Sequence, residues 1–168
     1  MSVDVFESYF SQFPVKVYKK RWPLIEAGDI VQKIFYIKSG YIRLYTVSAE
    51  GKEITFIVYK PGEFFPLISA LQPTTPFRYY VETLTRASII FVPINSFTAF
   101  FEGKPHLLLE LLERTMKRLD RILRRLEYAV FGDAYQKVIS IILILEEAFG
   151  KDHGKETIIE APLTHREI

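Results

Sequence analysis

Residues 33–59 read KIFYIKSGYIRLYTVSAEGKEITFIVY. Three runs in this stretch are rich in β-branched and aromatic residues, and the pairs Ser39-Gly40 and Glu50-Gly51 separate them. A glycine at such a junction supplies the positive φ that a tight turn needs, so the pattern predicts antiparallel strands joined by hairpins. The expected strands cover residues 33–38, 41–47 and 53–59.

The same texture extends from residue 15 to residue 93, with glycines and prolines at short intervals. Pro61-Gly62 ends one run, residues 72–76 form a loop, and two further strands are expected over residues 79–85 and 88–92. Many short strands with this punctuation are typical of a small antiparallel sandwich or barrel. The sequence therefore predicts an α+β chain whose first part is an antiparallel β-roll.

Helical patterns begin where the strand pattern ends. Residues 94–101 predict a short helix, with Asn95 or Ser96 as its N-cap. Gly103-Lys104-Pro105 interrupts the pattern, and a long helix follows. On the other side of the β region, residues 3–13 have mixed helical spacing and predict a further short helix.

The long helix carries a seven-residue repeat. From Leu108 to Ala129, residues at alternating steps of four and three are apolar apart from Thr115, and charged residues fill the positions between them. A strict repeat of this kind packs against a second helix, so it predicts a homodimer. Leu109, Leu111, Met116 and Leu123 widen the stripe, as a helix lying on its own domain requires, so packing on two sides stays open. The expected dimer interface consists of Leu108, Leu112, Thr115, Leu119, Ile122, Leu126 and Ala129.

A second helical segment follows the long helix. Gly132 predicts the helix end, and Asp133 predicts the N-cap of an amphipathic helix over residues 134–149. Residues 151–155 predict a polar turn, and residues 157–160 predict a short strand.

The last six residues, Leu163 to Ile168, have the pattern of a helix start. Thr164 and Glu167 are three residues apart, as in a capping box, where the hydroxyl and the carboxylate each accept from a backbone N–H of the first turn. We expect a helix that starts here to continue, so the domain that begins near residue 132 is expected to be incomplete at Ile168.

Composition limits the classes of function. Hydrophobic residues make up 49% of the 168 residues, which is enough for a large core in one ordinary domain plus an appendage. The net charge of +2 is too small to indicate nucleic acid or a membrane on its own. The chain has no cysteine, which excludes disulfides, thiolate zinc sites, iron–sulfur clusters and cysteine nucleophiles.

No targeting or membrane segment is expected. Residues 1–10 carry Asp4 and Glu7 and no long apolar run, so they do not resemble a secretory signal. The most apolar run, residues 138–145, is far too short to cross a bilayer. These features, with the absence of cysteine, predict a cytoplasmic protein with no membrane partner.

The sequence shows no pattern that indicates a catalytic or a metal-binding site. His106, His153 and His165 share no ligand spacing, so no metal site is expected. The sequence contains no serine-centred elbow, no P-loop and no dinucleotide glycine pattern, and no catalytic residue is predicted. The basic residues of the long helix alternate with acidic ones, which indicates a solvated face rather than a DNA-binding stripe.

The order of these features resembles the Crp/Fnr family of bacterial transcription regulators. A glycine-punctuated β-roll, a long dimer helix, a hinge and a fresh helical segment follow one another, and the resemblance covers nearly the whole chain. The matching stretches are Glu26-Ala27-Gly28-Asp29, Phe35 to Leu44, Glu50-Gly51-Lys52-Glu53, Pro61-Gly62-Glu63-Phe64-Phe65, and Leu163-Thr164-His165-Arg166-Glu167-Ile168.

The resemblance implies three parts. Residues 1–104 would form a cyclic-nucleotide-binding-like sensor domain, residues 105–131 a dimerisation helix, and residues 132–168 the beginning of a winged helix-turn-helix. The family inserts one recognition helix per subunit into successive major grooves of DNA. That helix is absent from this chain, so the implied partners are a second copy and, through the missing part, double-stranded DNA.

Family members that bind cyclic AMP carry a Gly-Glu pair and, downstream, an Arg-Ser or Arg-Thr pair that hold the ribose and the phosphate. The Gly-Glu positions correspond to Pro66 and Leu67, and the Arg-Ser positions to Phe77 and Arg78. Pro66 also lacks a backbone N–H. On the long helix, Ile122 and Leu123 stand where the family has hydroxyl residues. The resemblance therefore implies no cyclic AMP cofactor, although a one-residue shift of the 72–76 loop would return Arg78 to the phosphate position.

Two hypotheses remain for the pocket. It holds an unidentified small apolar effector, such as an aromatic carboxylate paired with Arg78, or its own side chains fill it and no small effector exists; the aromatic residues favour the second. The expected function is that of a Crp/Fnr-type regulator, and the alternative is a stand-alone dimeric module that regulates a protein partner. The expected lining is Phe65, Pro66, Leu67, Phe77, Arg78, Tyr79, Ile122 and Leu123.

Overall fold

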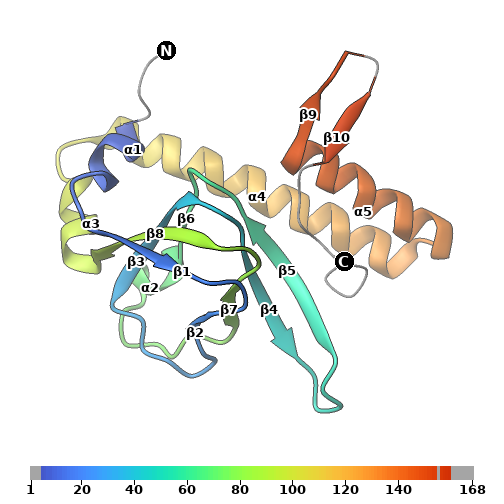
Figure 1. Cartoon of the computed structure of the whole chain (residues 1–168), viewed down its shortest axis with the longest axis horizontal. Helices are drawn as coiled ribbons and strands as arrows, with labels where there is room; N and C mark the ends of the chain where they lie inside the picture. The colour runs from blue at the N-terminus through green and yellow to red at the C-terminus, as the bar shows by residue number, and fades with distance from the viewer. Residues whose placement is uncertain (1–4, 155, 160–168) are drawn as a thin grey trace. The chain divides into compact units, whose positions relative to one another are not determined.

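The computed structural model describes residues 5–154 and 156–159 (Figure 1). The chain divides into two compact units, with the boundary between Glu102 and Gly103. Each unit has its own secondary structure. The predicted capping turn at Thr164 lies outside the described residues.

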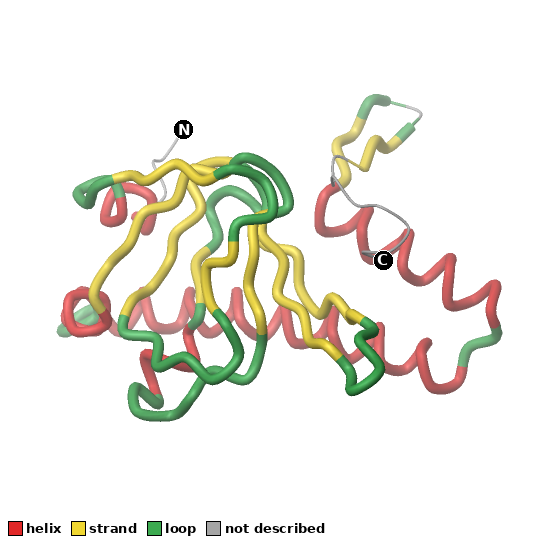
Figure 2. The backbone as a smooth tube through the Cα atoms, turned by 60° about the horizontal axis from the view of Figure 1, so that its bottom comes forward, coloured by secondary structure: helices red, strands yellow, loops and turns green. Residues whose placement is uncertain are grey.

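The first unit is an antiparallel β-roll, as the sequence predicts. Two four-stranded sheets, ordered β1-β8-β3-β6 and β2-β7-β4-β5, enclose a common core, and three short helices accompany them (Figure 2). The strands are β1 (Val15–Tyr18), β2 (Pro23–Ile25), β3 (Lys33–Ser39), β4 (Ile42–Val47), β5 (Glu53–Tyr59), β6 (Phe64–Phe65), β7 (Tyr80–Thr83) and β8 (Ala87–Pro93), and the helices are α1 (Val5–Phe10), α2 (Leu67–Leu71) and α3 (Ile94–Phe100).

Strand β3 is buried on both faces, which explains its continuous apolar run. Phe35 and Ile37 belong to the core between the sheets. Tyr36 points the other way and stacks on Phe10 of α1, with ring centroids 4.5 Å apart. Phe6 of α1 is fully buried as well, beside Phe64. The N-terminal helix therefore covers one face of the first sheet with aromatic rings.

The prediction of a hairpin at Ser39-Gly40 is wrong, although its two strands are present. β3 and β4 lie in different sheets, so the chain crosses from one sheet to the other at this point. Gly40 has the expected positive φ of 84°, and a Cβ there would lie 2.4 Å from the carbonyl oxygen of Arg86. Because it has no Cβ, Gly40 lets the chain pass close to residues 86–87 as it crosses between the sheets. The sequence pattern of such a crossing is the same as that of a hairpin turn. The Glu50-Gly51 hairpin is confirmed, since β4 pairs with β5 and Gly51 has a φ of 78°.

The N-cap predicted for the helix after β8 is also wrong. α3 begins at Ile94, directly after Pro93, and no side chain caps it. The backbone N–H of Ile94 instead donates to the carbonyl of Gln32 at 3.2 Å. A tertiary contact replaces the local cap, and spacing along the sequence does not reveal it.

The second unit consists of two helices and a small hairpin. α4 (Pro105–Phe131) ends at Gly132, and Asp133 starts α5 (Ala134–Phe149) with a capping box that pairs it with Gln136. β9 (Gly150–Asp152) and β10 (Thr157–Ile159) pair in antiparallel fashion. The helices and β10 are confirmed, whereas β9 extends over residues 151–152, where the sequence predicts part of a polar turn.

Candidate functional site

Two of the predicted pocket residues lie in the core of the roll. Phe65 is 1% exposed and Phe77 is 5% exposed. The ring of Phe65 stacks between Phe35 and Tyr59, with centroid distances of 5.2 Å and 4.7 Å. Stacked rings at these distances are in van der Waals contact, so the space beside β6 is occupied by side chains.

The Glu26 to Asp29 turn holds the loop that precedes β7. Gly28 donates its N–H to the carbonyl of Phe77 at 2.7 Å, and the N–H of Phe77 donates to the carbonyl of Asp29 at 2.8 Å. The amide of Phe77 is therefore committed to this turn. Its ring meets Tyr79, whose ring contacts Phe56, so an aromatic chain continues along the loop.

Pro66 and Leu67 stand at the start of α2, where a phosphate-binding loop would present amide N–H groups. Pro66 has no N–H, and its carbonyl accepts from the amide of Ser69 at 3.3 Å. Leu67 is half-buried and begins a helix of only five residues. Neither side chain has a group that could form a hydrogen bond to a ribose or a phosphate.

Arg78 is the one cation among the predicted pocket residues, and it is exposed. Glu82, four positions further along the chain, accepts from Arg43 and Arg21. The remaining predicted lining residues, Ile122 and Leu123, belong to α4 of the second unit, so their part in the pocket stays a prediction.

A surface hollow of about 280 Å³ lies elsewhere on the roll. It contains none of the predicted pocket residues, and its lining mixes apolar side chains with Asp29 and Lys33. It is wide open to solvent between β2 and β3, so it provides little enclosure for a ligand.

A buried arginine is the polar feature that sequence reasoning missed. Arg43 of β4 is 1% exposed, yet it forms ion pairs with Glu53 at 2.6 Å and Glu82 at 2.8 Å. Its guanidinium carbon lies 4.1 Å from the centre of the Tyr45 ring. The only signal in the sequence is a charged residue inside an apolar strand run, which by itself indicates a solvent-facing position.

The electrostatics of this cluster follow from its burial. Burial alone would lower the pKa of Arg43, but its hydrogen bond to Glu53 and the charges of both carboxylates outweigh burial and raise it. Burial raises the pKa of Tyr45, and the neighbouring carboxylate of Glu82 adds to that effect. Arg43 is thus held in its charged form.

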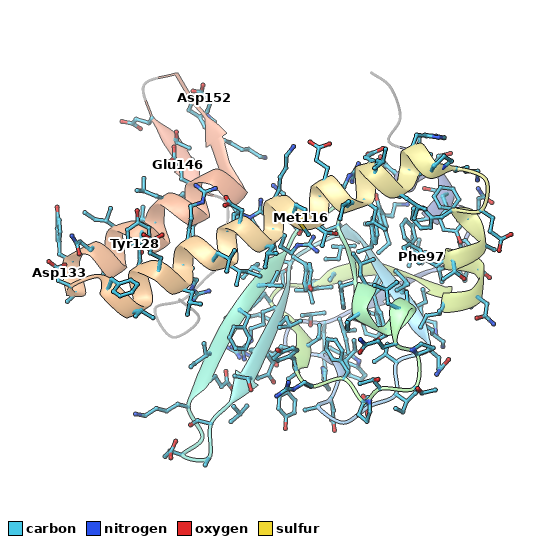
Figure 3. All side chains as sticks on the ribbon, turned by 180° about the vertical axis from the view of Figure 1, so that it is seen from behind. Phe97, Met116, Tyr128, Asp133, Glu146 and Asp152 are labelled. Carbon is cyan, nitrogen blue, oxygen red and sulfur yellow. The ribbon has the colours of Figure 1, made fainter. Side chains whose placement is uncertain are left out.

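The predicted dimer seam is exposed along α4. The exposed fractions of Leu108, Leu112, Leu119 and Leu126 are 49%, 52%, 44% and 56%. Thr115 and Ile122 are half-buried, and the Thr115 hydroxyl donates to the carbonyl of Leu111. The side chain of Ala129 lies outside the described part of the chain. Figure 3 labels Met116 and Tyr128 on the same helix, and both are exposed.

Ion pairs along α4 leave the seam free of charge. Glu110 pairs with Arg114 at 2.6 Å, Glu113 with Lys117 at 2.6 Å, and Asp120 with Arg124 at 2.7 Å, each one turn apart. Exposed pairs of this kind add about 0.2–0.5 kcal/mol each to helix stability. Their arrangement agrees with the solvated basic face that the sequence indicates.

Two further classes of site receive no support in the described part of the chain. No group of three or more His, Asp or Glu side chains there is placed to hold a metal ion. Within residues 5–154 and 156–159, no helix combines the length and the hydropathy that a membrane crossing requires.

Curated relatives of similar sequence are transcriptional regulators. A "Global nitrogen regulator" of Nostoc is 22% identical over 155 residues, which cover 92% of this chain and 70% of that protein. A "CRP-like cAMP-activated global transcriptional regulator" of Mycobacterium tuberculosis is 24% identical over 143 residues, covering 85% and 62%. This chain therefore spans about two thirds of the length of these relatives.

Solved structures share the fold. FixK2 from Bradyrhizobium japonicum has a TM-score of 0.75 at 16% identity, over 92% of this chain and 74% of that one. A mutant of CooA from Carboxydothermus hydrogenoformans has a TM-score of 0.72 at 19% identity, over 92% and 67%.

The family described as "Cyclic nucleotide-binding domain" matches residues 15–104, which is more than half of the chain and contains every strand of the roll. Together with the regulators above, this match shows that the chain belongs to the cyclic nucleotide-binding domain family, in its Crp/Fnr group of bacterial transcription regulators.

Proposed function

We propose that this chain is the sensor and dimerisation part of a DNA-binding transcription regulator that cyclic AMP does not control. The observation that carries the proposal is the exposed leucine seam of α4, which follows directly after a roll of the cyclic nucleotide-binding family. The curated relatives are named as regulators, which supports a regulatory rather than an enzymatic role and a site of action in the cytoplasm.

The seam fits a second copy of the same helix. An apolar stripe of four half-exposed leucines, edged by ion-paired charges, is the composition of a coiled-coil interface. In a symmetric dimer, each seam residue meets its equivalent, so the chain needs no other partner to cover the stripe. Pairing of two α4 helices then sets the distance between the two copies of the segment that begins at residue 132.

The output of the regulator is proposed to lie beyond α4. The capping box at Asp133 and the β9–β10 hairpin give residues 132–159 a helical start with a short wing-like hairpin, as the opening part of a winged helix-turn-helix requires. A dimer with two such domains would read two half-sites about one helical turn of DNA, roughly 10 base pairs, apart.

In vitro selection tests the proposed function. The full-length gene product that contains this chain is incubated with random duplex DNA, without and with cyclic AMP. We expect enrichment of an inverted pair of half-sites under both conditions. Failure to enrich any sequence would contradict the proposal and favour the alternative, a dimeric module that acts on a protein partner.

The side chains at the predicted pocket lead us to expect that cyclic AMP does not bind this chain. At about 100 times its dissociation constant, a ligand stabilises a protein by ~2.7 kcal/mol, which raises the Tm of a domain of this size by several degrees. We expect no shift with cyclic AMP or cyclic GMP in a thermal melt, because Pro66, Leu67 and Phe77 offer no partner for ribose or phosphate. Apolar carboxylic acids are screened in parallel, with Arg78→Ala as the matched control.

The two pocket hypotheses give different results in that screen. A response to an apolar acid that Arg78→Ala abolishes would establish a small effector and refute the filled pocket. A rise in Tm with micromolar cyclic AMP would refute both the filled pocket and the apolar effector.

A further inference from the structure

The β4–β5 hairpin changes register partway along its length. Leu44 pairs with Ile57, whereas the next residue, Tyr45, pairs with Thr55, so Phe56 is an extra residue in β5. Such a bulge bends the strand and increases its local twist. The hairpin thus has an inner part and an outer part that meet at the bulge.

The outer part of this hairpin has little backbone support. β4 pairs with its other neighbour, β7, only from Ile42 to Tyr45. Beyond Tyr45, residues 46–47 pair with residues 53–54 alone, as a two-stranded ribbon. An isolated two-stranded ribbon is at best marginally stable in water, so side-chain contacts must contribute to its position.

Arg43 supplies such a contact on the outer face of the sheet. Its neighbours Ile42 and Leu44 point into the core, so Arg43 points to the opposite face. Its Nη2 donates to Glu53, the first residue of β5 in the outer part of the hairpin, at 2.6 Å, and its Nε donates to Glu82 of β7 at 2.8 Å. One guanidinium therefore bridges the outer hairpin and the neighbouring strand across the bulge.

Aromatic rings fix the path of this side chain. The guanidinium lies against the ring of Tyr45, 4.1 Å from its centre, and Tyr45 stacks on Tyr80 of β7 with centroids 5.4 Å apart. The two carboxylates differ in exposure, because the side chain of Glu82 is 12% exposed and that of Glu53 is 43% exposed. The Glu53 contact is therefore the one that solvent and salt can reach.

We propose that Arg43 is an electrostatic latch, which holds the outer part of the β4–β5 hairpin to β7 through Glu53 and opens at that contact while Glu82 keeps the arginine in place. The latch links the hairpin to the strand that follows the 72–79 loop, so a change in that loop can alter the freedom of the hairpin. This inference concerns the roll alone and does not depend on DNA binding.

Hydrogen–deuterium exchange of the whole chain tests the latch, with Glu53→Gln as the variant and Lys52→Gln as the matched control. Glu53→Gln keeps an acceptor oxygen but removes the negative charge, which weakens the contact, so exchange of the amides in residues 46–55 should rise about fivefold. The control should leave them unchanged, and amides of β3 and β8 should be unaffected in both. Equal exchange in Glu53→Gln and the wild type would overturn the proposal, as would a uniform increase over the whole roll.

A salt series separates a latch from a merely structural contact. The exposed Glu53 contact is screened as ionic strength rises, so exchange of residues 46–55 in the wild type should increase with sodium chloride. Glu53→Gln has lost the charge that salt screens and should show no such dependence. The same salt response in both proteins would refute the assignment.

Discussion

Replacing Leu119 with arginine is expected to convert the chain from a dimer to a monomer. Leu119 lies in the middle of the seam and is 44% exposed in the single chain, so the folded monomer tolerates the change. In the dimer, each copy would lose about 1 kcal/mol of apolar burial, because less than half of the Leu119 side chain is left to bury, and would place an unpaired charge in the interface. The lost burial of two copies is about 2 kcal/mol, which alone weakens the dissociation constant roughly 30-fold, and the unpaired charges weaken it further.

Light scattering measures this change. Tyr128→Arg is the control, because Tyr128 is an exposed apolar residue of α4 that lies off the seam. The control should remain a dimer, and the full-length gene product with Leu119→Arg should lose its DNA sites. A stable dimer of Leu119→Arg would show that another surface joins the chains.

Phe65→Ala is expected to destabilise the roll by about 3–5 kcal/mol, the cost of truncating a fully buried phenylalanine. The ring fills the space between Phe35 and Tyr59, so its removal leaves a cavity there. Phe56→Ala is the matched control, since Phe56 is 39% exposed and should lose far less. Urea unfolding followed by circular dichroism gives both values.

This comparison bears on the filled pocket. If Phe65 lined an open effector cavity, its removal would cost little more than that of Phe56. Similar free energies of unfolding for the two variants would therefore count against a packed core at this position.

Sequence patterns predicted the features of this fold that depend on neighbouring residues. The capping box at Asp133 involves Gln136, three residues away, and the β4–β5 hairpin has its turn glycine at Gly51. Phe65 and Phe77 were expected to fill the pocket because large aromatic residues are usually buried, and the structure places both in the core.

The features that sequence patterns missed depend on distant partners. The sequence around Gly40 has the pattern of a hairpin turn, whereas its close neighbour in space is Arg86, in the turn between β7 and β8. The sequence does not reveal the burial of Arg43, because its two ionic partners come from β5 and β7, 10 and 39 positions away. Alternation along one strand identifies the outer face, but it does not reveal what covers that face.

Pairing of α4 is the central claim, because coupling between a sensor and a DNA-binding domain requires it. Sedimentation equilibrium of the wild-type chain tests it most directly. We predict a mass twice the 19.6 kDa of one chain at micromolar concentration, and the same mass when cyclic AMP is present. If the mass stays at 19.6 kDa at protein concentrations well above the micromolar range, the account is contradicted.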